Sequence, residues 1–409
     1  MSIRLRVLVL TSTYPRWPGD REPGFVHELC RRLTVDFDVT VLGPHAAGAR
    51  KEEIMDGVRV QRYRYAPVYW ETLVNDGGIV TNLRRQPWKW LLVPGFLFMQ
   101  MLATWRLIRR YRPDVIHAHW LLPQGLLVAV LHRIVRRTPP FLVTSHGADL
   151  FALRGQLFTA LKRFVAHQAA AITVVSEAMR TELVNIGADV SKIEIRPMGV
   201  DLSRRFTPDA SILRSDDEML YVGRLVEKKG LRYLIEAMPA ILASHPKAYL
   251  TVAGFGPEER ALRAQVQQLG LDAKVKFIGA VEQANLPVLY RRAAVFVAPF
   301  VQAVSGDREG LGLVCIEAAG CGCPVILSDL ATSRDMFSDS RNVIFVPPAD
   351  SSALARAVHN LLSASNTYRE VAIADRQQMM DRFDLHAVSQ RYTQILRRLS
   401  RAAKYEQHE

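Results

Sequence analysis

The sequence predicts an α/β protein made of two doubly wound, Rossmann-like domains. Short apolar runs rich in β-branched residues alternate with helical patterns, which is typical of parallel sheets flanked by helices. The alternation begins again after about residue 215. A chain of 409 residues with 49% hydrophobic and 23% charged residues has the size and composition of a folded protein of two or three domains.

The first half supplies one set of alternating elements. Apolar runs predict strands at residues 6–12, 38–43, 114–120, 141–147 and 170–176, and helical spacing predicts helices at 25–33, 126–137 and 177–187. We therefore assign residues 1–203 to an amino-terminal domain.

The second half supplies another set. Strands are predicted at residues 218–224, 248–256, 274–279, 295–300 and 323–329, and helices at 231–245 and 313–320. We assign residues 204–385 to a carboxyl-terminal domain. A last helix, about 386–409, lies beyond its strands and can dock on either domain, including back on the first.

One apolar stretch, residues 90–108, raises the question of a membrane. Pro94, Gly95, Gln100, Thr104 and Arg106 interrupt it, so we predict no transmembrane helix there. Two alternatives stay open, a core helix and a helix partly immersed in a membrane interface. The amino-terminal apolar run of about five residues is too short for a secretory signal.

The basic character of the chain lies in its first half. Lys and Arg exceed Asp and Glu by 12 in residues 1–205 and by 1 in residues 206–409. The basic residues form scattered pairs such as Arg84–Arg85, with no nucleic-acid module around them, so we expect no nucleic-acid partner. An anionic membrane surface and a merely solvated basic face remain as alternatives.

The four cysteines, Cys30, Cys315, Cys321 and Cys323, lack the paired spacings of zinc sites. We interpret them as reduced core thiols, which favours the cytoplasm, with the inner membrane face as a possible docking place.

The segment "VGRLVEKKG" places Gly223, Arg224 and Lys229 after a predicted strand and before a helix. Because the helix dipole disfavours cations at that end, a bound anion would explain them. We interpret the segment as a phosphate site. In "VAGFGPEER", Gly254 and Gly256 follow a strand, but the third glycine of a dinucleotide fingerprint is missing. These glycines would let the backbone approach a nucleotide base.

Two carboxylates stand in "REGLGLVCIEAAG". Glycines 310 and 312 predict that Glu309 lies in a loop and Glu317 in the helix that follows. On one continuous helix they would lie about 12 Å apart along the axis, too far to share a small group. A loop-helix corner could line one elongated ligand, with backbone amides near Leu311 and Gly312 available to phosphate. A carboxylate in an apolar helix needs a partner, which polyol hydroxyls could supply.

Together with "VKFIGAV", "APF", "SHGADL" and "PMGVD", these motifs resemble the family-four retaining glycosyltransferases of the GT-B fold, in which two such domains face each other across a cleft. The first half, with "DVIHAHWLLPQG", resembles members that build bacterial exopolysaccharide, teichuronic acid or lipopolysaccharide.

The resemblance assigns roles residue by residue. It implies that Arg224 and Lys229 hold the donor diphosphate, that Glu317 binds the ribose, and that Glu309 contacts the donor sugar with His146 nearby. We take the catalytic set as His146, Arg224, Lys229 and Glu309. The full donor-binding set is Gly223, Arg224, Lys229, Gly254, Gly256, Glu309, Gly310, Leu311, Gly312 and Glu317, and the acceptor-binding set is Gly24, Phe25, His119, Gln124 and Asp149.

Two positions depart from the family pattern. The amino-terminal loop "REPGF" has one glycine where many members have two, which puts its contact with phosphate in doubt. Met198 replaces the usual asparagine before "GVD", so a polar contact at the domain junction is in doubt.

The resemblance implies transfer of a hexose, with retention, from a nucleotide-diphosphate sugar to a glycan or polyprenyl-diphosphate-linked acceptor. The donor is then a co-substrate, and no other cofactor is expected. No Asp-x-Asp cluster stands near a strand end, and the two cations can stabilise the leaving diphosphate, so we expect no metal. A glycoside hydrolase, a nucleotide-sugar epimerase and a non-catalytic assembly scaffold are the alternatives.

Overall fold

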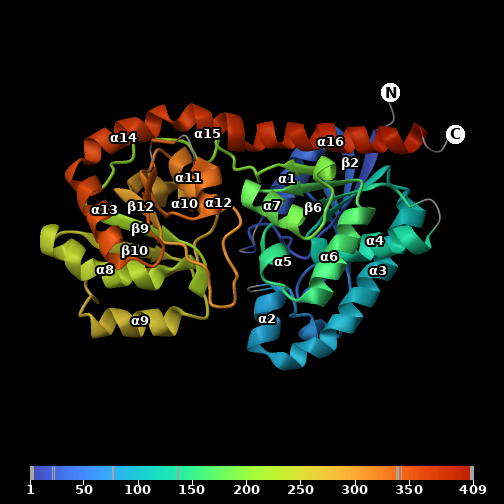
Figure 1. Ribbon diagram of the computed structural model, residues 1–409, viewed down its shortest axis with the longest axis horizontal. Helices are drawn as coiled ribbons and strands as arrows, with labels where there is room; N and C mark the ends of the chain where they lie inside the picture. Colours follow the sequence, from blue (N-terminus) through green and yellow to red (C-terminus); the bar gives the residue numbers. More distant parts are fainter. Residues whose placement is uncertain are drawn as a thin grey trace. The chain divides into compact units, whose positions relative to one another are not determined.

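The computed structural model describes residues 4–20, 22, 24–75, 78–135, 138–337, 340–341 and 343–405. The chain divides into two compact units (Figure 1). Unit 1 comprises Met1–Pro197 and Val388–Glu409, and unit 2 comprises Met198–Ala387. Unit 1 is therefore formed by two separate stretches of the chain, and unit 2 by the stretch between them.

Unit 1 contains an eight-stranded sheet in the order β3-β4-β2-β1-β5-β6-β7-β8. All its neighbouring strands are parallel except β3, which is antiparallel to β4. The strands are β1 (Leu5–Leu10), β2 (Phe37–Pro44), β3 (Glu52–Met55), β4 (Val58–Tyr63), β5 (Val115–His119), β6 (Phe141–Thr144), β7 (Ala171–Val174) and β8 (Ile193–Ile195). The chain order reverses between β1 and β5, and ligands of such sheets bind at the carboxyl ends of the strands beside that point.

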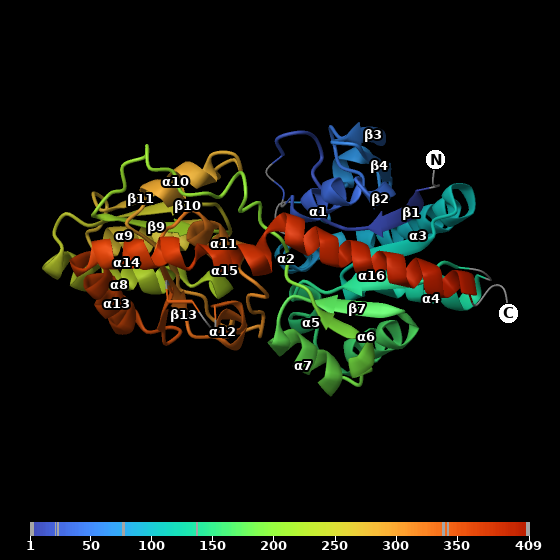
Figure 2. The same cartoon turned by 90° about the horizontal axis from the view of Figure 1, so that it is seen from above.

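Helices cover both faces of this sheet. They are α1 (Phe25–Leu33), α2 (Ile79–Arg85), α3 (Leu92–Tyr111), α4 (Leu126–Ile134), α5 (Ala148–Phe151), α6 (Gln156–Gln168), α7 (Glu177–Asn185) and α16 (Leu385–Tyr405), with the short turns η1 (Val68–Trp70), η2 (Pro87–Leu91), η3 (Leu121–Gly125) and η4 (Val190–Lys192). Apolar residues of α1 and α16 form one buried cluster with β1 and β2 (Figure 2). From Val388 onward the last helix is therefore part of the core of unit 1.

Unit 2 contains a six-stranded, fully parallel sheet in the order β11-β10-β9-β12-β13-β14. Its strands are β9 (Glu218–Val222), β10 (Tyr249–Ala253), β11 (Val275–Gly279), β12 (Val295–Ala298), β13 (Val325–Ser328) and β14 (Val343–Val346). Its helices are α8 (Leu231–Ser244), α9 (Glu259–Gln268), α10 (Leu286–Arg292), α11 (Leu313–Gly320), α12 (Ala331–Phe337), α13 (Ser351–Ser363), α14 (Ser365–Ala374) and α15 (Arg376–Phe383), with the turn η5 (Glu227–Lys229). The chain order reverses between β9 and β12.

The predicted alternation of strands and helices is confirmed in both halves, and the helix predicted at 313–320 has those bounds. Four strands were missed. Strands β3, β4, β8 and β14 have only three to six residues each. Strand β4 has polar residues between buried ones, and β3 has one buried residue in four, so both lack the continuous apolar run by which the other strands were recognised.

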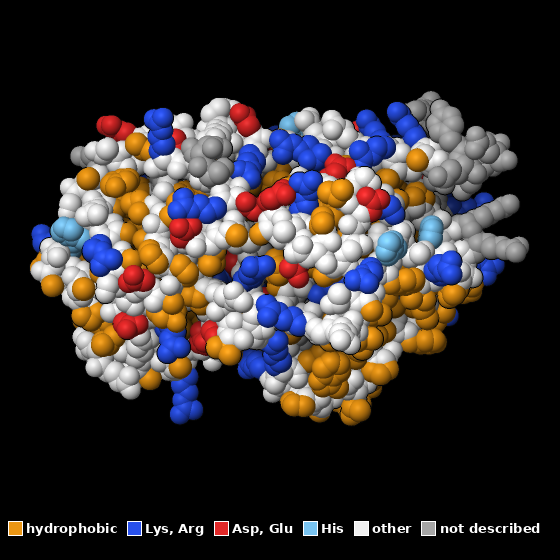
Figure 3. Space-filling view, viewed as in Figure 1, with side chains coloured by type: hydrophobic (Ala, Val, Ile, Leu, Met, Phe, Trp, Pro, Cys, Tyr) orange, Lys and Arg blue, Asp and Glu red, His pale blue; other side chains and the backbone are white. Residues whose placement is uncertain are grey.

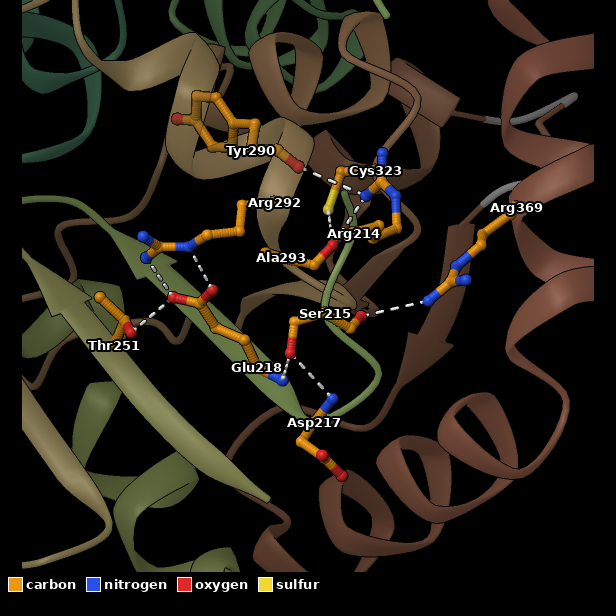
Figure 4. Close-up of polar contacts among 10 residues, drawn as sticks. All are labelled: Arg214, Ser215, Asp217, Glu218, Thr251, Tyr290, Arg292, Ala293, Cys323 and Arg369. Atoms are coloured by element: carbon orange, nitrogen blue, oxygen red, sulfur yellow. Dashed lines mark hydrogen bonds and ion pairs between the residues drawn. The ribbon is translucent and has the colours of Figure 1, made fainter. Parts of the chain in front are cut away.

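An ion pair with a buried carboxylate lies at the amino end of β9 in unit 2 (Figure 4). The carboxylate of Glu218, at the start of β9, accepts hydrogen bonds of 2.7 Å from Arg292 Nε, Arg292 Nη2 and Thr251 Oγ1. Glu218 lies at the end of β9 opposite to the ligand-binding end, so the pair has a structural position.

Among the described residues, one helical stretch, Pro87–Tyr111, is long and apolar enough to cross a membrane. Helix α3 within it also packs on β2, β4 and α4 of unit 1. The prediction that residues 90–108 form a helix is confirmed, and its relation to a membrane is taken up below.

Candidate functional site

The candidate site in unit 2 lies where β9 and β12 end side by side. The loop after β9 carries Gly223 and Arg224, and the loop after β12 leads through Phe300 to Glu309. Because this is the point at which the chain order of the sheet reverses, the fold itself brings the two predicted motifs to one edge.

Lys229 is the centre of this edge. It ends the turn η5, and Gly230, with φ +65°, starts α8. A Cβ atom at Gly230 would lie 1.8 Å from the carbonyl oxygen of Pro299, so only glycine lets the two loops approach. This approach places Lys229 Nζ 4.4 Å from the centroid of the Phe300 ring and 2.8 Å from Glu309 Oε2.

Glu309 lies in a strongly positive environment. Burial alone would raise the pKa of its carboxyl, but Lys229, with Lys228 and Arg224, lowers that pKa to about 2. Glu309 is therefore ionised at any physiological pH, and it serves as a hydrogen-bond acceptor and a fixed negative charge. A carboxyl of this kind is unsuited to donate a proton as a general acid.

The loop that carries Glu309 is tied to η5 by three further contacts. The backbone N–H of Val301 donates to Lys228 O at 2.9 Å, and that of Val304 donates to Glu227 Oε1 at 2.9 Å. Lys228 Nζ lies 3.2 Å from Asp307 Oδ2. Lys228 is thus engaged with the loop, while its neighbour Lys229 is directed to the ring of Phe300 and to Glu309.

Glu317 lies inside α11 and is nearly fully buried. Tyr290 donates a hydrogen bond to its Oε2 at 2.9 Å, and Gln283 donates one to its Oε1 at 3.0 Å. Burial raises the pKa of Glu317, while these two hydrogen bonds lower it in part. The partners that this carboxylate needs in an apolar helix therefore come from the protein itself, since α10 and the loop before it supply two. Each oxygen still has a lone pair for a further donor, so contact with ribose stays a prediction.

The predicted glycines lie in close backbone contacts. A Cβ at Gly254 would lie 1.9 Å from Gly223 O, and one at Gly256 would lie 2.4 Å from Leu225 O. Gly312, with φ +69°, directly precedes α11, and Gly310 and Leu311 are buried before it. The loops after β9 and β10 are therefore in mutual contact, which accounts for these glycines without a ligand. Their role toward a nucleotide stays a prediction.

Unit 1 has its own cluster at the carboxyl ends of β1, β5 and β6. Gly24 precedes α1, and nothing lies within 4 Å of the place where its Cβ would be. The ring of Phe25 lies 4.9 Å from that of His146, centroid to centroid, and Trp120 packs on both rings. The loop residues and the histidine predicted from separate motifs are therefore neighbours.

His146 is half-buried and is joined to the buried His119. His119 Nδ1 lies 2.9 Å from His146 Nε2, with the two rings stacked. Burial lowers the pKa of His146 to about 3, helped by the charge that His117 would carry, and lowers that of His119 well below its usual value. Because both rings are neutral, one nitrogen donates and the other accepts, so this hydrogen bond fixes the tautomer of each ring.

A further histidine extends this network into the core. His117 Nε2 lies 2.7 Å from Thr144 Oγ1, which lies 2.6 Å from Thr173 Oγ1, and Tyr392 of α16 stacks on the ring of His117. Burial lowers the pKa of His117 to about 3. The network thus connects the edge of the sheet to the last helix of the chain.

Asp149 and Gln124, predicted to line the acceptor side, have partners within unit 1. Asp149 accepts hydrogen bonds from Leu121 N at 2.7 Å and Ser145 Oγ at 2.9 Å. The side-chain amide nitrogen of Gln124 donates a hydrogen bond to His119 O at 3.1 Å, and its side-chain oxygen accepts one from Ser12 N at 3.2 Å. Both side chains are buried. Their contacts give them positioning roles for the loops, and contact with an acceptor stays a prediction.

The structure thus brings the predicted residues together in two groups, Lys229 with Glu309 and Phe25 with His119 and His146. Sequence reasoning missed the aromatic ring beneath Lys229, Phe300, and the two donors to Glu317, Gln283 and Tyr290. Phe300 follows a strand in the quoted "APF", so it could have been found. Tyr290 lies in an ordinary amphipathic helix and gives no signal.

Two family descriptions match the chain in succession. "Glycosyltransferase Family 4" matches residues 25–204, and "Glycosyl transferases group 1" matches residues 205–378. The first match ends at residue 204 and the second begins at residue 205.

Relatives with assigned names cover most of the chain. A glycogen synthase of Mycobacterium tuberculosis is 26% identical over 96% of this chain and 94% of its own length. A phosphatidyl-myo-inositol mannosyltransferase of Mycobacterium leprae is 30% identical over 69% of this chain and 72% of its own. A putative colanic acid biosynthesis glycosyltransferase of Salmonella typhimurium is 26% identical over 69% of this chain and 70% of its own.

Solved structures share the fold. The sucrose-phosphate synthase of Thermosynechococcus elongatus superimposes with a TM-score of 0.79 at 22% identity, over 98% of this chain and 100% of its own. The Anabaena protein HepE, solved in complex with UDP-glucose, superimposes with a TM-score of 0.71 at 16% identity, over 96% of this chain and 99% of its own. The two-domain GT-B fold predicted for this chain is confirmed by these structures.

Proposed function

The chain belongs to the family 4 glycosyltransferases, and on that premise we propose that it moves a hexosyl group from a nucleotide-diphosphate sugar to a glycan or lipid-linked acceptor in bacterial surface polysaccharide synthesis. The arrangement of Lys229, Glu309 and Arg224 at the reversal point of the unit 2 sheet carries this proposal. The complex of HepE with UDP-glucose and the colanic acid role named for the Salmonella relative support the donor class and the product class.

In this proposal unit 2 holds the donor. Lys229 and Arg224 bind the diphosphate, and their positive charges stabilise the negative charge that develops on it as the sugar-phosphate bond breaks. Glu309 accepts hydrogen bonds from hydroxyls of the sugar, which its permanently ionised state suits. Glu317 accepts hydrogen bonds from the ribose.

We propose that the reaction retains the configuration of the anomeric carbon. The bond from this carbon to the phosphate oxygen breaks, and the acceptor oxygen forms its bond from the same side. The proton of the acceptor hydroxyl goes to an oxygen of the departing diphosphate. Because Lys229 and Arg224 supply the counter charge, we propose that no metal ion is required.

Unit 1 binds the acceptor in this proposal. Gly24 and Phe25 border open space at the end of β1, and neutral His146 offers a hydrogen bond beside them. We place the enzyme in the cytoplasm, a location that its four buried cysteines, none of them in a disulfide, favour.

The test is a panel of nucleotide sugars incubated with glycan and polyprenyl-diphosphate acceptors, followed by analysis of released nucleotide and of the sugar product. We expect nucleotide release that depends on an acceptor, an α-linked product from an α-linked donor, and activity in the presence of EDTA. Release without acceptor would indicate a hydrolase, and a donor altered in its sugar would indicate an epimerase.

Two variants sharpen this test. Lys229→Ala should lower kcat/KM about 100-fold, because charge-assisted hydrogen bonds of this kind contribute about 2 to 3 kcal/mol. Lys228→Ala removes the same charge one residue away, from a side chain directed to Asp307, and should change kcat/KM only a few-fold. Equal effects of the two substitutions would contradict the proposed role of Lys229.

A further inference from the structure

The segment from η1 to α3 of unit 1 exposes an unusual number of large apolar side chains. More than a third of the surface of each of seven residues is open to solvent, and Leu91 is 82% exposed and Trp90 and Phe98 are each 58% exposed. The seven residues are Val68, Tyr69, Trp70, Trp88, Trp90, Leu91 and Phe98. Figure 3 shows orange side chains gathered over this region, at the lower right of the view. Isolated exposed apolar residues are normal, but a gathered set marks an interaction surface.

Helix α3 carries apolar residues on its outward face as well as among the buried residues Leu92, Phe96, Leu107 and Ile108. Its buried face includes Gln100 and Thr104, and the amide of Gln100 has no hydrogen-bond partner among the described residues. Its outward face carries Leu91, Pro94 and Phe98 at helical spacing, and continues through the half-buried Leu102 and Trp105. Such a pattern is unfavourable if water covers the outer face, and favourable if an apolar phase covers it.

The charged residues of the sequence segment that carries most of this face have one sign. Residues 77–113 contain seven basic residues and no acidic residue. Lys89 is buried and bonded to Thr72 O, and the other six are exposed, namely Arg84, Arg85, Arg106, Arg109, Arg110 and Arg112. Two of these arginines precede the apolar stretch and four follow it. Arg109 also lies over the ring of Trp105, 5.0 Å from its centroid.

We propose that this face, defined by Trp70, Trp88, Trp90, Leu91, Phe98 and the flanking arginines, docks unit 1 on an anionic lipid bilayer. Tryptophan and tyrosine favour the boundary between headgroups and hydrocarbon, and arginines beside them bind lipid phosphates. Scattered like charges without one acidic residue suit a uniformly anionic surface better than a protein partner, whose surface mixes both signs. Because α3 also packs on β2, β4 and α4, it lies on the bilayer and does not cross it.

The experiment uses the full chain and vesicles of phosphatidylcholine with 30% phosphatidylglycerol, scored by co-sedimentation and by tryptophan emission. We expect binding to these vesicles, a blue shift of the emission, and much weaker binding to pure phosphatidylcholine. Substitution of Arg109 and Arg110 by Gln should weaken binding about fivefold for each arginine removed.

The decisive variant carries Trp88→Ser, Trp90→Ser, Leu91→Ser and Phe98→Ser. It should lose vesicle binding and remain folded, with a modest fall in the temperature of thermal unfolding, because Trp88, Trp90 and Phe98 are about half exposed and Leu91 is mostly exposed. A matched variant replaces four other exposed apolar residues by serine, Val35, Ile54, Leu157 and Leu213, and should bind as the unsubstituted protein does.

Several results would overturn the proposal. They are equal loss of binding in the two serine variants, equal binding to pure phosphatidylcholine, and no binding to the anionic vesicles. A dimer in sedimentation velocity that only the first variant abolishes, with no vesicle binding, would assign this face to a second copy of the chain. Resistance to alkaline carbonate extraction would indicate a helix that spans the membrane.

Discussion

Lys229 Nζ lies 2.8 Å from Glu309 Oε2, although the two residues come from loops that follow different strands of the unit 2 sheet. Lys229 helps to keep Glu309 ionised, and Glu309 holds the side chain of Lys229 in place before any ligand arrives. A donor diphosphate would therefore meet a lysine already held in place by a carboxylate.

The pH dependence of activity follows from this pair. Since the pKa of Glu309 is about 2, its ionisation should produce no acid limb in the profile of kcat/KM between pH 5 and 8. In Lys229→Ala the largest opposing charge is gone, and burial should raise the pKa of Glu309. An acid limb should then appear, which steady-state kinetics at several pH values would detect. If the acid limb also appears in the double variant Lys229→Ala, Glu309→Gln, another group is responsible for it.

His119 should act as a positioning residue for His146. His119→Phe removes the hydrogen bond that fixes the tautomer of His146, and should lower kcat about tenfold with a smaller change in the KM for the donor. His119→Asn keeps a polar atom near the position of Nδ1 and should restore part of the loss. If both variants raise only KM, or lose activity equally, the positioning role is wrong.

Stability should fall as the pH is lowered from 7 to 5. His117, His119 and His146 stay neutral when folded, because burial holds their pKa values far below the value of about 6.5 in the unfolded chain. Below pH 6.5 the unfolded chain binds protons that the folded chain does not, so each histidine removes about 1 kcal/mol of stability per pH unit.

This can be measured as the midpoint of urea unfolding at pH 7.5, 6.5 and 5.5. Burial also raises the pKa of Asp149, which acts in the opposite direction at the acid end. His117→Phe should reduce the change in the free energy of unfolding per pH unit by roughly a third. If the pH dependence of stability is unchanged in this variant, other groups govern the acid sensitivity.

The ion pair at the amino end of β9 should contribute to stability and not to donor binding. Arg292→Ala leaves the fully buried carboxylate of Glu218 with Thr251 as its remaining side-chain donor, and should lower the free energy of unfolding by about 3 kcal/mol. The value lies at the low end of the usual range because the Arg292 side chain is 44% exposed. Binding of donor, measured by calorimetry, should be unchanged.

Arg263→Ala provides the comparison. The distance from Arg263 to Glu259 is similar, 2.8 Å, but both side chains are exposed to water. The free energy of unfolding should therefore fall by less than about 1 kcal/mol. Similar losses for the two arginines in thermal or urea unfolding would contradict the distinction between buried and exposed pairs.

Much of the fold could be predicted from the sequence because buried parallel strands have continuous apolar runs. The loop position of Glu309 and the helix position of Glu317 followed from two glycines and an apolar pattern. Strands β3 and β4 were missed because half of their residues are polar and no apolar run exists. In the candidate site, the residues could be named, but their partners could not. The bonds of Glu317 to Tyr290 and Gln283 depend on how α10 packs against α11, which no local pattern encodes.

The last helix has a consequence for the order in which the protein is completed. Val388, Tyr392, Ile395, Leu396 and Leu399 belong to the same apolar cluster as Val7, Val9 and Leu33 near the start of the chain. A ribosome that has made every strand of unit 1 has still to make the whole of unit 2 before these side chains emerge. The amino-terminal unit is therefore the first to be synthesised and the last to be finished, and a message truncated after unit 2 would leave it with an uncovered sheet.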